Sequence, residues 1–214
     1  MKLKKKALLL IKILSLSLIF SACTFDLEKA THDLKYKKPT YINEILIVNK
    51  GIGLPSSFDP GENPDAVESF NAMKTDAQSA GLTLRAFSTY RDYDRQKYLY
   101  DNYVEKDGKE AADTYSARPG FSEHQTGLAF DVGNKDPKHD AMMSFEDTNE
   151  FNWLKENSYK YGFILRYPKD KENITGFMYE PWHYRYVGNE IAKDIFDQSI
   201  SLDEYLNSVY PNYN

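Results

Sequence analysis

Two short segments, about fifty residues apart, bring together the residue types that bind metals and move protons. The first, residues 122–131, has the sequence SEHQTGLAFD, and the second, residues 180–183, has the sequence EPWH. Two imidazoles and one carboxylate can hold a zinc ion and leave its fourth position to water. Glu180, three residues before the second histidine, could accept a proton from that water. The residue types therefore predict a zinc hydrolase with the ligands His124, Asp131 and His183.

A cation near the cleaved carbonyl would complete such a site, and Arg91 is the candidate. It follows a predicted strand that ends near Ser88, and a guanidinium suits an oxyanion or a substrate carboxylate. A second arginine, Arg118, fits a substrate contact and an ordinary surface position equally well. The spacing of His124 and Asp131 by itself is weak evidence, because a buried histidine bonded to a carboxylate in a structural core would have the same pattern. The second segment makes the metal site the favoured interpretation.

The alternation of residues around the first segment predicts how it presents its side chains. In residues 128–132 the bulky Leu, Phe and Val alternate, so they would face the core while Asp131 faces the opposite side of a strand. Positions seven apart on a flat strand lie on opposite faces. Gly127 interrupts the strand pattern and would let the chain turn His124 back towards Asp131.

The rest of the chain predicts the elements that must hold these segments. Apolar residues recur at helical spacing in some stretches and alternate in others, without the regular rhythm of a parallel α/β fold. This order indicates an α+β fold with a small, mainly antiparallel sheet and flanking helices. The predicted strands are 43–49, 82–88, 128–132, 163–167 and 177–186; the predicted helices are 64–80, 93–104, 151–161 and 189–196, with a short one in 108–115.

The N-terminus has the features of an export signal. Residues 1–22 combine a basic start, an apolar stretch too short to span a bilayer and small residues at the end, which predicts a signal peptide. Cys23, the single cysteine of the chain, follows directly and resembles the lipidated cysteine of bacterial lipoproteins. The alternative is a cleavage site nearby that leaves a free thiol. Residues 23–40 would form the lipidated cysteine and a polar tether with a solvated His32, and residues 41–214 one catalytic domain.

The overall charge excludes one class of partner. The formal net charge is −5 at pH 7. Loss of residues 1–22 removes five lysines and no acidic residue, which leaves 22 basic against 32 acidic residues and a charge of −10. Nucleic-acid binding requires positive charge to neutralise phosphates, so it is not expected. A single cysteine also excludes an intramolecular disulfide and a thiolate-bound metal cluster.

The two segments also resemble a known family. The pattern of 122–131 together with 180–183 is similar to zinc D-alanyl-D-alanine carboxypeptidases of the VanY type and to related L,D-carboxypeptidases of the LAS metallopeptidase group. The likeness runs from Val48, through Arg91 and Arg118, to Gly188. It implies a LAS-type fold, zinc bound by His124, Asp131 and His183, Glu180 as catalytic base, Arg91 as the group that stabilises the tetrahedral intermediate, and Ser122 and Gln96 in the substrate pocket.

These features together predict a lipid-anchored enzyme on the outer face of a bacterial membrane that trims a terminal D-Ala from peptidoglycan stem peptides. D,D-cleavage and L,D-cleavage use the same zinc chemistry, so both stay open. One alternative is a catalytically silent lipoprotein that only binds cell-wall peptides, and another is an endopeptidase that cuts cross-bridges. Glu180 favours catalysis, because a silent relative needs no base beside the metal.

Overall fold

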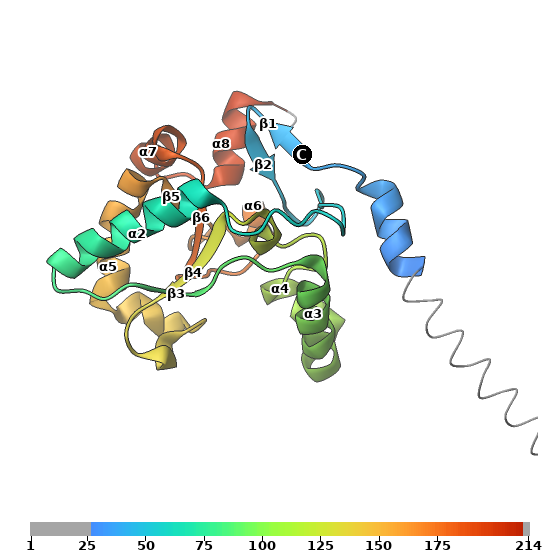
Figure 1. The fold of residues 1–214 in the computed structure, drawn as a ribbon, viewed down its shortest axis with the longest axis horizontal. Helices are drawn as coiled ribbons and strands as arrows, with labels where there is room; N and C mark the ends of the chain where they lie inside the picture. The colour runs from blue at the N-terminus through green and yellow to red at the C-terminus, as the bar shows by residue number, and fades with distance from the viewer. Residues whose placement is uncertain (1–26, 212–214) are drawn as a thin grey trace, which may run out of the picture.

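The computed structural model describes residues 27–211, and its centre is a four-stranded antiparallel sheet. The sheet order is β3-β4-β6-β5, and a separate two-stranded hairpin, β1-β2, precedes it in the chain (Figure 1). The α+β fold with a small antiparallel sheet is therefore confirmed. The strands are β1 (Thr40–Ile42), β2 (Ile45–Ile47), β3 (Arg85–Ser88), β4 (Ala129–Gly133), β5 (Phe163–Leu165) and β6 (His183–Tyr186).

Helices and short 3₁₀ turns fill the spaces between the strands. The α-helices are α2 (Pro64–Ser79), α3 (Tyr93–Asp107), α4 (Lys109–Tyr115), α5 (Asn149–Asn157), α6 (Glu172–Thr175), α7 (Asn189–Gln198) and α8 (Leu202–Val209). The 3₁₀ turns are η1 (Glu123–Thr126), η2 (Pro137–His139), η3 (Met143–Asp147) and η4 (Ser158–Tyr161). Most of these helices were predicted from the sequence, but α6 and α8 were not. Residues 168–175 were expected to form a loop, and α8 starts with a capping box between Ser201 and Glu204.

The local sequence explains why α2 begins and which face it buries. The side chain of Asn63 accepts a hydrogen bond from the backbone N–H of Ala66, and Pro64 occupies the first turn, where its missing N–H costs nothing. Phe70 and Met73 then point inward. Each fully buried side chain of this kind contributes about 1.5–3 kcal/mol through removal from water, so this face fixes α2 against the sheet.

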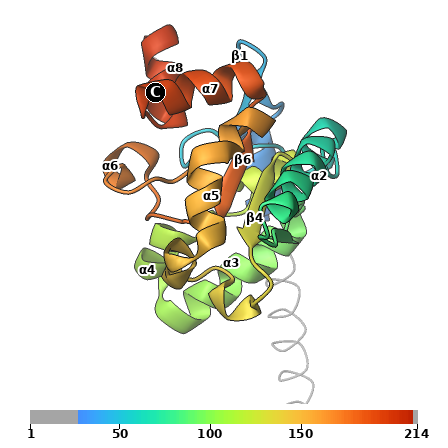
Figure 2. The ribbon, with the colours of Figure 1, turned by 90° about the vertical axis from the view of Figure 1, so that its left-hand side faces the viewer.

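Alternation along β4 separates the hydrophobic core from the catalytic face. Phe130 and Val132 pack against α2 and α5, which lie close to the sheet in Figure 2, whereas Asp131 belongs to the other face. On the neighbouring strand Tyr184 joins the same core. The two-residue period predicted for this segment is thus confirmed. The buried core consists of Ala66, Phe70, Met73, Ala77, Leu84, Phe130, Val132, Phe145, Phe151, Leu154, Phe163, Tyr179 and Tyr184.

A second hydrophobic cluster holds the C-terminal helices. Ile164, on the face of β5 opposite to Phe163, packs with Ile45 and Ile47 of β2 and with α7 and α8. Leu202 and Leu206 are the buried residues that α8 contributes. This cluster explains why β2, α7 and α8 lie together at the top of Figure 1.

The start of the described chain is not a free tether. Residues 27–35 are helical, and this segment is called the N-terminal helix below (Figure 1). Its side chains bond to residues of the catalytic domain. The His32 ring nitrogen Nε2 lies 2.7 Å from the carbonyl oxygen of Leu54, and the ring packs edge-on against Phe121. Asp33 accepts hydrogen bonds from the backbone and the hydroxyl of Ser56. The expectation of a solvated His32 was therefore wrong.

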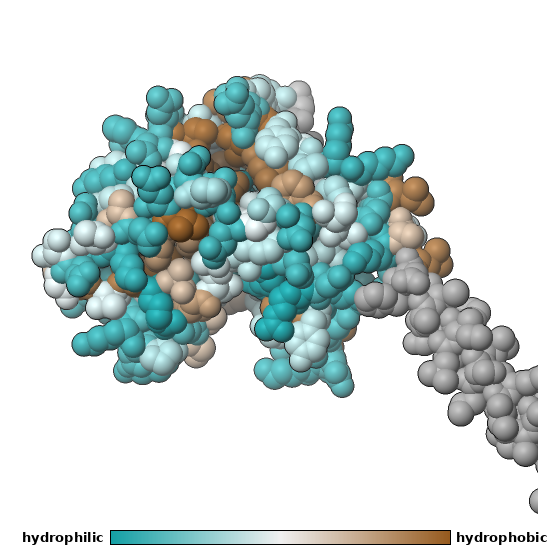
Figure 3. All heavy atoms as spheres, in the orientation of Figure 1, coloured by the Kyte–Doolittle hydropathy of each residue, from teal (hydrophilic) through white to brown (hydrophobic). Residues whose placement is uncertain are grey.

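The surface of the described residues is mostly hydrophilic on the face shown in Figure 3, with smaller hydrophobic patches between polar side chains. Within residues 27–211 no helix has the length and hydrophobicity needed to cross a bilayer. The predicted signal peptide, residues 1–22, and Cys23 lie outside the described residues.

Candidate active site

The three predicted ligands converge on one point of the catalytic face. Asp131 on β4 and His183 on β6 are directly paired in the antiparallel register, so their side chains lie side by side. His124 comes from η1, just before the start of β4. Its Nε2 lies 3.1 Å from Asp131 Oδ2, and His183 Nδ1 lies 3.0 Å from Asp131 Oδ1. One donor atom from each residue lies within 4.8 Å of the others.

The turn that returns His124 to this face depends on a glycine. Gly127 has φ 73°, in the left-handed region. A Cβ at this position would lie 2.0 Å from the carbonyl oxygen of Gly61, so no other residue fits without movement of the backbone. The neighbouring chain is held by the backbone N–H of Asn63, which donates to the Gly127 carbonyl at 3.0 Å. The prediction that Gly127 turns the chain is confirmed.

In each histidine, a hydrogen bond to one ring nitrogen leaves the other ring nitrogen facing Asp131. His124 Nδ1 donates to the backbone carbonyl of Thr89, which can only accept, so Nε2 is left free towards Asp131. The other histidine is arranged the opposite way round. Nε2 of His183 lies 3.4 Å from the Glu123 carboxylate, so Nδ1 faces Asp131. Such outer partners orient the ring and fix its tautomer.

Glu180 stands next to this group, as expected for a base. Its Oε2 lies 3.8 Å from His183 Nδ1, and its backbone N–H donates to the Tyr167 carbonyl at 3.1 Å. The side chain is buried, and burial raises its pKa to about 8; His183 opposes this shift, and the Asp131 carboxylate adds to it. A carboxyl group whose pKa lies near neutrality can both accept and return a proton.

Arg91 is fixed at the edge of the same group. Its Nη2 lies 3.9 Å from Asp131 Oδ2, and its Nη1 donates to Gln96 Oε1 at 2.9 Å. The Gln96 amide in turn donates to the Ala117 carbonyl at 2.6 Å. Burial lowers the pKa of Arg91, and Asp131 opposes that effect. Because every link is a hydrogen bond or an ion pair, the guanidinium is held in one position before a substrate arrives.

A cleft of about 710 Å³ opens onto these groups. Ser122, Gln96, Arg91 and Glu180 all line it, together with the three ligand residues. The structure thus brings every predicted site residue that it describes to one cleft. Further walls come from Tyr103, Lys106, Tyr115, Ser116, Ala117, Ala141, Met142, Met143, Ser144, Tyr167, Phe177, Met178 and Trp182.

Comparison with known proteins decides the family. The family model for VanY, D-alanyl-D-alanine carboxypeptidase, matches residues 61–189. This chain belongs to the VanY family. The putative carboxypeptidase YodJ of Bacillus subtilis is 42% identical over 186 residues, which cover 78% of this chain and 68% of YodJ.

Two solved structures show the same fold. An L,D-carboxypeptidase, DacB from Streptococcus pneumoniae, has a TM-score of 0.68 and 41% identity and covers 78% of this chain and 95% of its own. A vancomycin-resistance D,D-pentapeptidase, VanY, in complex with Zn(II), has a TM-score of 0.65 and 36% identity over 76% of this chain and 98% of its own. The chain is accordingly a zinc carboxypeptidase of the VanY family.

The residues present fit zinc as the cofactor. Imidazole nitrogen and carboxylate oxygen are common zinc donors, and three protein ligands are typical of a catalytic site, which keeps a position for water or substrate. His124, Asp131 and His183 would hold the ion through Nε2, a carboxylate oxygen and Nδ1. Zinc is therefore the metal that this group of donors suits.

A buried charge network that was not predicted from the sequence lies behind the site. Glu123 Oε1 accepts from Arg166 Nε at 2.7 Å and from Arg185 Nη1 at 3.0 Å, and Arg166 also pairs with Asp203 of α8. These side chains are at most 5% exposed. Burial raises the pKa of Glu123, but the two guanidiniums and His183 outweigh it and hold the pKa well below the ordinary range. The network therefore supports His183 from behind with a charged carboxylate.

A partial signal for this network was present in the sequence. Arg185 lies two residues after His183 on a strand, so the two side chains must share a face. Glu123 lies directly before His124. Nothing in the local sequence, however, indicated Arg166 or Asp203, which reach the network from other elements.

Proposed function

We propose that this zinc carboxypeptidase removes a C-terminal D-alanine from peptidoglycan stem peptides. The observation that carries the proposal is the convergence of His124, Asp131, His183 and Glu180 at the floor of one open cleft. The names of the relatives support the substrate class, since they act as D,D- or L,D-carboxypeptidases. A silent binding protein would not require a buried carboxyl group such as Glu180 beside the ligands.

Each group at the site has a separate role in amide hydrolysis. Zinc, when bound, lowers the pKa of a water molecule to about 7 and polarises the carbonyl of the bond to be cut. Glu180 accepts a proton from the attacking water and later donates one to the leaving amine. Its burial keeps its proton affinity high enough for the second step.

Three polar side chains bind the substrate and stabilise the charge that develops during hydrolysis: Arg91, Gln96 and Ser122. The Arg91 guanidinium stabilises negative charge on the oxygen of the cleaved carbonyl, and its bond to Gln96 fixes its direction. Gln96 and Ser122 line the cleft beside it and contact the terminal residue of the substrate. These roles explain why three polar side chains, which would otherwise cost free energy on burial, lie at the cleft.

We further propose that the enzyme is exported and anchored through a lipid on Cys23. The basic and apolar leader before this cysteine supports the proposal. Only three residues separate Cys23 from the first described residue of the N-terminal helix, which docks on the catalytic domain. A lipid at Cys23 would therefore keep the cleft close to the outer face of the membrane, where stem peptides are found.

Two experiments test these proposals. The purified domain would be incubated with a stem pentapeptide and a stem tetrapeptide, and free D-Ala would be measured by mass spectrometry. Release from the first indicates D,D-cleavage and from the second L,D-cleavage, whereas release from neither contradicts the enzyme assignment. For anchoring, the Cys23→Ala variant should move from the membrane fraction to the medium. An unchanged distribution would contradict the lipid anchor.

A further inference from the structure

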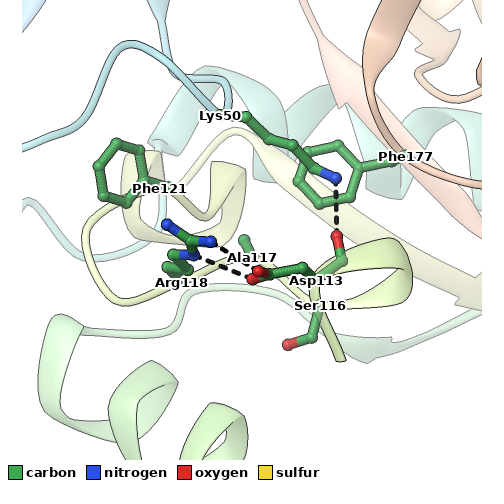
Figure 4. A pocket seen from close by; sticks show the side chains of 7 residues that line it. All are labelled: Lys50, Asp113, Ser116, Ala117, Arg118, Phe121 and Phe177. Carbon is green, nitrogen blue, oxygen red and sulfur yellow. Dashed lines mark hydrogen bonds and ion pairs between the residues drawn. The ribbon is translucent and has the colours of Figure 1, made fainter. Parts of the chain in front are cut away.

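A second pocket lies beside the catalytic cleft and has no role in the chemistry described above. It has a volume of about 300 Å³, and its lining includes Lys50 and Arg118 (Figure 4). Ser116, Ala117 and Phe177 line both this pocket and the catalytic cleft, so the two hollows share a wall. A peptide that occupies the cleft could therefore extend a side chain into the pocket.

Lys50 is held in the pocket without an acidic partner. Its ammonium donates to the backbone carbonyl of Asp113 at 2.6 Å and lies 4.5 Å from the centre of the Phe177 ring. Among residues 27–211 no carboxylate oxygen lies within 4.0 Å of this nitrogen. The aliphatic part of the side chain crosses Gly176, where a Cβ would lie 3.1 Å from Lys50 Cδ. Lys50 is thus positioned by a backbone carbonyl and an aromatic ring. Burial lowers the pKa of its ammonium group, and the Asp113 carboxylate opposes this shift.

The second cation of the pocket, Arg118, pairs with a carboxylate on one side only. The Arg118 guanidinium forms a fork on the Asp113 carboxylate, with distances of 2.9 and 2.6 Å, while 54% of its side chain stays exposed. Figure 4 shows the Lys50 ammonium at the backbone carbonyl of Asp113 and the Arg118 guanidinium at its carboxylate. Two cations and one carboxylate leave the pocket with one net positive charge. An anionic group bound there would neutralise this charge.

The remaining walls are aromatic. Phe177 is buried and packs on Tyr167, which in turn contacts the ring of His183. Phe121 forms the other wall, and the N-terminal helix supports it through the ring of His32. These apolar walls reduce the exposure of the pocket to water, which strengthens the attraction between Lys50 and an anionic group.

We propose that this pocket is a specificity subsite that binds a second carboxylate of the stem peptide, remote from the bond that is cut. The proposal rests on the proposed function and specifies its substrate: a peptide with a free acidic side group is preferred over the same peptide with that group amidated. Lys50 supplies the charge, and Arg118, held by Asp113, supplies further N–H donors. The competing interpretation is that Lys50 and Arg118 only fasten α4 to the segment after β2.

The test compares two stem peptides that differ only in a free or an amidated D-glutamate carboxyl group. In the wild type the ratio of kcat/KM for the acidic over the amidated peptide should exceed one. Lys50→Met keeps the aliphatic contact with Gly176 and removes the charge, so this ratio should fall about three- to tenfold, as expected for a partly exposed ion pair with a charge-assisted hydrogen bond. Lys193→Met, an exposed lysine of α7, is the matched control.

The following outcomes would refute the proposed subsite. An equal loss of kcat/KM for both peptides in Lys50→Met would mean that Lys50 only fastens α4. A fall of the ratio in Lys106→Met and not in Lys50→Met would place the carboxylate in the part of the catalytic cleft that Lys106 lines. If the wild type cleaves neither peptide, the proposed function fails, and calorimetric binding of the two peptides to zinc-loaded Glu180→Gln and Lys50→Met proteins still tests the pocket. Equal affinities of the two peptides for the Glu180→Gln protein, which retains Lys50, would then refute the subsite.

Discussion

Replacement of Glu123 by Gln separates two effects that a buried carboxylate has on this site. The wild-type network contains two guanidiniums and two carboxylates, so its formal charge is zero. Glu123→Gln leaves a formal charge of +1 buried around Arg166 and Arg185. Removal of one partner from a buried ion pair typically costs about 3–5 kcal/mol, because the other charge stays desolvated. The substitution also takes the negative charge away from His183 Nε2.

The second effect acts on the metal. Loss of an outer partner of a metal-binding histidine typically lowers metal affinity about 10- to 100-fold. Asp203→Asn is the matched control, because it removes a carboxylate from the same network on the far side of Arg166 and does not touch His183. We expect both variants to lower the free energy of unfolding, but only Glu123→Gln to weaken zinc binding.

Two assays measure these quantities separately. Urea unfolding of the metal-free proteins gives the loss of stability, and competition with a chromophoric chelator gives the dissociation constant for zinc. An equal loss of zinc affinity in Glu123→Gln and Asp203→Asn would show that the network acts only through stability. Unchanged zinc affinity in Glu123→Gln would refute the orienting role of the carboxylate.

Three further predictions follow from the site. Glu180→Gln should retain zinc, measured by metal analysis, and lower kcat by about 10²–10⁴-fold, because it removes a proton carrier and no ligand; a variant with near wild-type turnover would exclude Glu180 as the base. His183→Ala should lose both zinc and activity, and equal zinc content in this variant and the wild type would contradict the ligand assignment. The hydrogen bond from Arg118 outweighs burial and lowers the pKa of Asp113 to about 2. The stability that this ion pair contributes is therefore complete above the unfolded pKa of about 3.9 and is lost as the pH falls through 2. NMR titration of Arg118→Gln should show the pKa of Asp113 return towards 3.9, and a pKa that stays near 2 would exclude the ion pair as the cause of the shift.

Much of the candidate site could be predicted because its information is local. The metal-binding residue types in 122–131 and 180–183 already predict a zinc hydrolase. The alternation of Phe130, Asp131 and Val132 predicts which side chain leaves the core, and Gly127 marks the turn. Helix α2 was predicted from its apolar spacing, with Pro64 in its first turn and Gly81 after its end; the Asn63 cap became visible only in the structure. These features depend only on residue type and on a period of two or 3.6 residues.

The errors of the sequence analysis concern contacts between distant segments. His32 lies in a polar stretch that has no partner until the chain folds and places Leu54 and Phe121 against it. Helix α8 was not predicted either: it has only eight residues, and packing of Leu202 and Leu206 in the second hydrophobic cluster holds it in place. Short helices gain little from propensity alone and depend on tertiary packing.

The sequence by itself therefore determined the α+β class and predicted the ligands and the base, since these follow from residue chemistry and local periodicity. Only the tertiary structure decided which nitrogen of each histidine faces the metal, because that choice depends on Thr89 and Glu123 as outer partners. It also decided that Glu123 meets Arg185, 62 residues away, and that Lys50 and Arg118 share one pocket. Strand register and helix docking, which bring remote residues within hydrogen-bonding distance, are properties of the whole chain and leave no local pattern.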